Sequence, residues 1–133
     1  MKDSLIQKGF ILAGLSNILG VLVCSKGLTN DVMMQAQPGV MGFFGLVSIM
    51  LWGGAYIAVS NRYADVRWLV GVFVAEKLVY VLAWFGFLSA QSLGAVYEQD
   101  TLAGIFYTIY GANDFIFMLF FAYVFLKTGR PAE

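Results

Sequence analysis

Four long apolar stretches dominate this sequence and limit the folds it can adopt. They run roughly over residues 9–25, 39–59, 68–90 and 102–126. Each approaches the ~20 residues with which an α-helix crosses ~30 Å of hydrocarbon. Hydrophobic residues make up 60% of the 133 positions and charged residues 12%, more apolar side chains than a soluble domain of this size buries. The sequence therefore predicts an all-α integral membrane protein, a single four-span transmembrane domain over residues 1–133.

The first stretch follows Lys2 and Lys8, as the apolar part of a secretory signal peptide also would. No small-x-small cleavage site follows it, and Val23 precedes Cys24 where a lipoprotein signal has a small residue. We therefore expect a retained span.

The positions of the cations predict the orientation. Six cations fall before the first stretch, between the second and third, or after the fourth: Lys2, Lys8, Arg62, Arg67, Lys127 and Arg130. The other two connections, residues 27–37 and 91–101, are polar and acidic. The only cation next to them is Lys26, directly before the first. By the positive-inside rule both termini are cytoplasmic, which requires an even number of spans. Short connections then favour an up-down-up-down four-helix bundle in a cell membrane, as in a multi-pass protein of a bacterial inner membrane.

Stripes of mostly small residues predict the contact faces of the first two helices, because small side chains let helices approach closely in lipid. The stripe of the first helix is Gly9, Ala13, Asn17, Gly20 and Cys24, and that of the second is Gly42, Gly45, Ile49, Gly53 and Tyr56. Pro38 suits the first turn of the second helix.

Several classes of function are disfavoured. Eight basic residues balance eight acidic ones, so no basic surplus attracts nucleic acid. Cys24 is the only cysteine and the chain has no histidine, which removes the usual ligands of zinc, haem, copper and iron–sulfur sites. We expect neither a metal nor another cofactor.

Polar residues occur near the middle of three of the four stretches. They are Asn17, the adjacent Glu76 and Lys77, and the adjacent Asn113 and Asp114. A charged residue at the centre of a membrane helix costs ~2.5 to 3.5 kcal/mol on insertion scales, so these groups should pair with one another.

Glu76 and Lys77 point ~100° apart around one helix and should therefore address different neighbours. We expect Lys77 or Glu76 to meet Asp114, with Asn17 and Asn113 adding hydrogen bonds. Two carboxylates against one lysine leave a surplus negative charge, so the cluster is a candidate proton site. Three tyrosines should line the approach to the carboxyls: Tyr80, Tyr107 and Tyr110.

Three functions fit this cluster. The first is proton-coupled transport or ion conduction by a homo-oligomer. The second is acid–base catalysis on, or binding of, a lipid-like or quinone-like molecule, with Glu76 or Asp114 as acid and base and Lys77 stabilising negative charge. The third is an accessory subunit of a larger membrane complex. A static polar clamp that sets helix register is the non-functional alternative, and no catalytic residue is assigned.

In size and span count the chain resembles the small multidrug-resistance transporters, and in general outline the DoxX-like small membrane proteins. The former carry their essential glutamate in the first helix, where this chain has Asn17. No site residue is therefore carried over from either resemblance.

Overall fold

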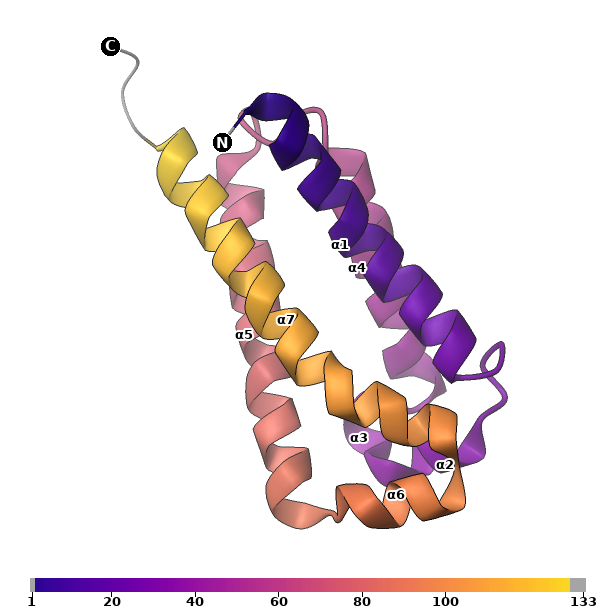
Figure 1. Ribbon diagram of the computed structural model, residues 1–133. Coiled ribbons are helices and arrows are strands. Elements are labelled where there is room, and N and C mark those ends of the chain that lie inside the picture. Colours follow the sequence, from indigo (N-terminus) through magenta and orange to yellow (C-terminus); the bar gives the residue numbers. More distant parts are fainter. Residues whose placement is uncertain (1, 130–133) are drawn as a thin grey trace.

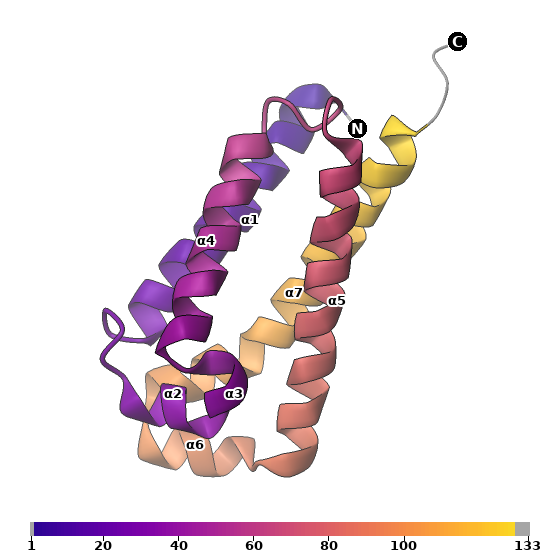
Figure 2. The same ribbon diagram turned by 180° about the vertical axis from the view of Figure 1, so that it is seen from behind.

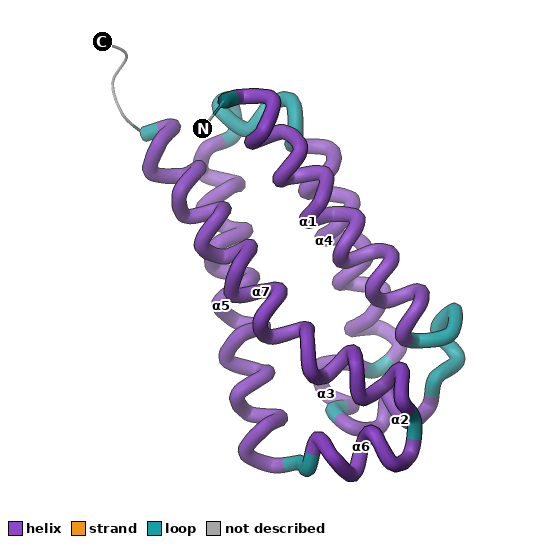
Figure 3. Tube along the Cα trace, viewed as in Figure 1, coloured by secondary structure: helices purple, strands orange, loops and turns teal. Residues whose placement is uncertain are grey.

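A computed structural model describes residues 2–129, and within that range the chain forms helices and loops without a strand (Figure 3). The helices are α1 (Asp3–Cys24), α2 (Asp31–Ala36), α3 (Pro38–Met41), α4 (Phe43–Val59), α5 (Arg67–Ala90), α6 (Leu93–Gln99) and α7 (Thr101–Thr128) (Figure 1). The all-α prediction is confirmed for this part of the chain. Arg130 lies outside the described residues.

Three helices, α1, α5 and α7, are long and apolar enough to cross a membrane. The fourth apolar helix, α4, has 17 residues. Large apolar side chains point outward from the long helices, among them Leu12, Val79 and Ile116, each about 60% exposed. An apolar exterior on long helices suits contact with lipid rather than water, so the chain has the character of a membrane protein.

Residues 39–59, which the sequence predicted as one helical span, do not form one continuous helix. The chain breaks at Gly42, whose φ of −68° and ψ of 179° are extended and separate α3 from α4. Just after the break the backbone is crowded, because a Cβ built on Gly45 would lie 1.8 Å from the carbonyl oxygen of Val40. Pro38 does stand in a first helical turn, at the start of α3.

The two polar connections also differ from the loops that the sequence indicated, since they contain the short helices α2 and α6. Side-chain caps start both of them: Asn30 accepts a hydrogen bond from the Met33 amide, and Ser92 accepts one from the Ala95 amide. The caps stabilise the first turn of each short helix, and both helices also contact α7.

The long helices are arranged as two packed pairs. Helix α1 packs along α4, helix α5 packs along α7, and contacts between α1 and α7 join the pairs (Figure 2). The short helices α2, α3 and α6 gather at one end of the molecule (Figure 1). The start of α1 and the end of α7 lie at the opposite end (Figure 1).

Helices α1 and α4 approach each other closely at Gly14 and Gly53. A Cβ built on Gly53 would lie 2.7 Å from the Gly14 carbonyl oxygen, and one on Gly14 would lie 2.5 Å from that of Gly53. The predicted contact role of Gly53 is thus confirmed, whereas Gly14 was missed. Gly20 does not share this role, because a Cβ there meets no other described atom within 4 Å.

Candidate functional site

The polar residues of α1, α5 and α7 form a layer between two apolar cores. One core contains Ala13, Phe73 and Phe117, and the other contains Val21 and Tyr110. Asn17 lies one turn from both Ala13 and Val21 on α1, and Asp114 lies similarly between Tyr110 and Phe117 on α7. The regular helical rise therefore brings these groups to one level.

Lys77 is the centre of this layer. Its side chain is 1% exposed, and its Nζ atom lies 2.8 Å from Oδ1 of Asp114 in an ion pair between α5 and α7. Nζ also donates a hydrogen bond of 3.2 Å to Oδ1 of Asn17 on α1. The Asn17 amide in turn donates to the Ile49 carbonyl of α4 at 2.9 Å. A single lysine thus links all four apolar helices.

Of the two pairings that the sequence left open for Asp114, the structure has the one with Lys77. Asn113 adds a hydrogen bond from its Nδ2 atom to Oδ1 of Asp114 at 3.4 Å. This is a long contact for an N–H donor and a weak one. The second oxygen of Asp114, Oδ2, is the acceptor that this carboxylate can offer to another molecule.

Glu76 takes a different partner, as its angular separation from Lys77 predicts. Its carboxylate accepts a hydrogen bond from the hydroxyl of Tyr56 on α4. The Lys77 ammonium lies over the ring of Tyr56, 5.1 Å from its centroid, so this tyrosine contacts both Glu76 and Lys77. The sequence pattern placed Tyr56 only on a packing face. The need of a buried phenol for an acceptor was the signal that could have identified it.

Two of the three tyrosines predicted to line the approach to the carboxyls donate their hydroxyl protons to other groups. Tyr107 donates to the Met33 carbonyl at 2.6 Å, and Tyr110 donates to Oε1 of Gln37 at 2.7 Å. Tyr107 therefore bonds α2, and Tyr110 bonds the residue between α2 and α3, instead of a carboxylate. Tyr80 packs at the edge of the second apolar core.

A cavity of about 250 Å³ lies beside Asp114, between α1, α7 and the α3–α4 segment. Its polar lining includes Asn17, Tyr110, Asn113 and Asp114. The rest is mainly apolar: Val21, Met41, Ile49, Phe106 and Ile109. Such a mixture of a few polar groups in an apolar wall is typical of small-molecule sites.

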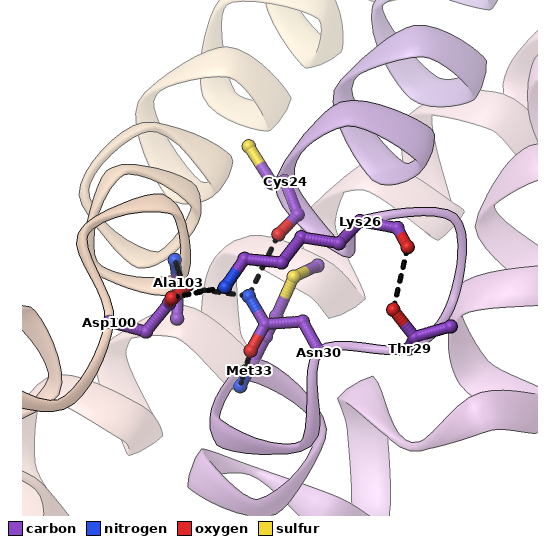
Figure 4. Close-up of polar contacts among 7 residues, drawn as sticks. All are labelled: Cys24, Lys26, Thr29, Asn30, Met33, Asp100 and Ala103. Carbon is purple, nitrogen blue, oxygen red and sulfur yellow. Dashed lines mark hydrogen bonds and ion pairs between the residues drawn. The ribbon is translucent and has the colours of Figure 1, made fainter.

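A second polar cluster lies at the end formed by the short helices (Figure 4). Asp100, the N-cap of α7, accepts hydrogen bonds from Lys26 at 2.6 Å, Asn30 at 2.7 Å and the Ala103 amide at 2.8 Å. These bonds, that from Lys26 foremost, lower the pKa of Asp100 to about 2. The cluster ties the segment after α1 to the start of α7.

Among residues 2–129 no three His, Cys, Asp or Glu side chains gather as a metal site would require. Comparison of the chain with protein-family models, with curated proteins and with solved structures finds no match. The geometry of the cluster and its cavity is therefore the basis for a functional assignment.

Proposed function

We propose that this chain is a proton-linked membrane transporter whose working site is the Lys77–Asp114 pair and the adjoining cavity. One observation carries the proposal: Asp114, half of a buried ion pair in the middle of two long apolar helices, lines a cavity large enough for a small molecule. Charged groups at such positions are costly and usually functional.

We further propose that α1, the α3–α4 segment, α5 and α7 are four spans, with both termini cytoplasmic. Helix α4 alone extends about 26 Å, somewhat less than ~30 Å of hydrocarbon, and α3 lengthens it at one end. The start of α1, the start of α5 and the end of α7 share one end of the molecule (Figure 1). This common end carries Lys2, Lys8, Arg67 and Lys127, which favours a cytoplasmic location.

Charge balance suggests how a proton would be used. Glu76, Asp114 and Lys77 together carry one surplus negative charge when all three are ionised, and one proton removes it. A proton arriving at Asp114 would remove the negative charge that holds Lys77. Because Lys77 also holds Asn17 of α1, its release would loosen α5 from α1 and α7 together. Such loosening is the kind of conformational step that transport requires.

Infrared titration of the carboxyl groups tests this function. In lipid-reconstituted protein, the C=O stretching band of a protonated carboxyl should appear and vanish within a few pH units of neutrality. We expect Glu76→Gln or Asp114→Asn to remove it, and Glu98→Gln, a change at an exposed residue of α6, to leave it. If no such band titrates near neutrality and both cluster variants assemble and function as the unmodified chain does, proton linkage is wrong.

The same cavity favours a second function, acid–base catalysis on a lipid-soluble substrate. Asp114 would act as general base, and Lys77 would stabilise negative charge on the substrate. Turnover of a substrate in detergent, without a second compartment, would support catalysis over transport. Use of the charges as contacts with a larger complex is less well supported, because Lys77, Glu76 and Asp114 are all buried within the chain itself.

A further inference from the structure

The cavity beside Asp114 has its rim on the outer surface of α1 and α7. Ile109 is 48% exposed, and Ser16, Gly20 and Asn113 are partly exposed. The deeper lining includes Asn17 and Asp114, which are buried. The cavity is therefore a lateral pocket with a polar floor and a rim at the side of the helix pair.

Both ends of the α1–α7 pair are closed by other contacts. At one end the ring of Phe120 lies against Gly9, where a Cβ would meet it at 2.4 Å, and Phe10 packs edge-on against the same ring. At the other end Lys26 bonds Asp100, at the start of α7 (Figure 4). The rim between these closures is on the lipid-facing side of two apolar helices, so a molecule would reach it from the hydrocarbon.

The floor of the pocket offers mainly hydrogen-bond acceptors. Oδ2 of Asp114 is available, because Lys77 and Asn113 both donate to Oδ1. The Tyr110 hydroxyl gives its proton to Gln37 and keeps acceptor capacity. The Asn17 amide group donates to Ile49. An occupant that brings a donor therefore finds an acceptor at this floor in Oδ2 of Asp114.

The charge of the floor further limits the occupant. Lys77 neutralises Asp114 at 2.8 Å, and Glu76, the other carboxylate of the cluster, bonds Tyr56 and does not line the pocket, so a cationic head finds little net attraction there. An anionic head meets acceptors and would lose its hydration. A neutral hydroxyl can donate to Oδ2 and leave its apolar body against Val21, Phe106 and Ile109.

We propose that the pocket binds a small neutral amphiphile with a hydroxyl head, which enters sideways from the bilayer between α1 and α7. This inference rests on the proposed function in taking the cavity beside Asp114 as the working site, and it names the class of molecule handled there.

A photoreactive probe tests the proposal. The full chain, reconstituted in lipid, is labelled with a diazirine derivative of 1-octanol, and the labelled peptides are mapped by mass spectrometry. We expect labels at the rim positions of α1 and α7, displaced by 1-octanol but much less by octanoate or octylammonium. Equal displacement by octanoate, or labels spread evenly over the lipid-facing helices, would overturn the proposal.

Two glycine variants make the test specific to the pocket. Gly20→Leu adds a side chain at a residue that lines the cavity, where a Cβ has no described neighbour within 4 Å. Gly54→Leu is its match on the exposed side of α4, where a Cβ is equally free of described neighbours. We expect rim labelling to fall to the level of other lipid-facing peptides in Gly20→Leu and to stay unchanged in Gly54→Leu. Unchanged rim labelling in folded Gly20→Leu would contradict the proposal.

Failure here and failure of proton linkage are distinguishable. Rim labelling without a titrating carboxyl would support the binding site and contradict proton linkage. A titrating carboxyl without rim labelling would overturn only the assignment of the amphiphile.

Discussion

Removal of the buried lysine should destabilise the chain more than the loss of any single surface charge. Lys77→Met keeps the length of the side chain but deletes the ammonium that lies 2.8 Å from Asp114 and 3.2 Å from Asn17. The Asp114 carboxylate is then buried without its counter-charge. Breaking a buried pair from one side typically costs about 3–5 kcal/mol, so we expect the free energy of unfolding to fall by roughly 3 kcal/mol.

The second partner provides the critical comparison. In Lys77→Met with Asp114→Leu the uncompensated charge is gone, and stability should recover to within about 1–2 kcal/mol of the unmodified chain. Lys8→Met, a change at an exposed position of α1, is the control and should alter stability by no more than about 0.5 kcal/mol. Unfolding is followed by circular dichroism as SDS replaces a mild detergent. If the single Lys77 variant is as stable as the Lys8 variant, or the double variant is the least stable of all, the reasoning is refuted.

Three further outcomes are expected. Gly53→Ala should lower stability by about 1–3 kcal/mol, because its Cβ would meet the α1 backbone at 2.7 Å. Its control, Gly54→Ala, should be neutral or slightly stabilising. Equal effects of the two changes in the same SDS titration would contradict the close helix contact. Tyr56→Phe should cost about 1–3 kcal/mol by leaving Glu76 without its phenol donor, and an unchanged unfolding midpoint would argue against that bond. Asp100 has a pKa of about 2 in the folded chain against 3.8 unfolded, so its charge stabilises the fold above pH 3.8 and ceases to do so as the pH falls towards 2. Asp100→Asn preserves the helix cap but not the charge, so its thermal midpoint should lie below that of the unmodified chain at pH 7 and converge with it near pH 2; a constant gap would refute this.

The buried layer and the outer cluster are different kinds of polar contact. The Lys77–Asp114 pair lies between two apolar cores, and its Asp114 lines a cavity, whereas Lys26 and Asp100 meet where the Lys26 side chain is 49% exposed. Solvent screens the outer pair, so it serves mainly to position α1 and α7. This positioning matters for the lateral pocket, because it fixes one end of the helix pair that forms the rim.

Sequence by itself determined the class of the protein and the level of its polar groups. Apolar stretches of about 20 residues determine helices that suit a bilayer, and the rise per residue places Asn17, Lys77 and Asp114 at similar heights. The angular step between Glu76 and Lys77 likewise determined that they take different partners. All of this is local, because height and angle along one helix depend only on position in the chain.

Only the tertiary structure decided which groups meet. The choice of Lys77 over Glu76 as the partner of Asp114, and of Tyr56 as the partner of Glu76, depends on how each helix is rotated towards its neighbours. The break at Gly42 likewise depends on packing, since nothing in an unbroken apolar run marks where the backbone must bend. A cavity is the space that several helices leave between them, so its volume and its lateral rim have no counterpart in any one segment of sequence.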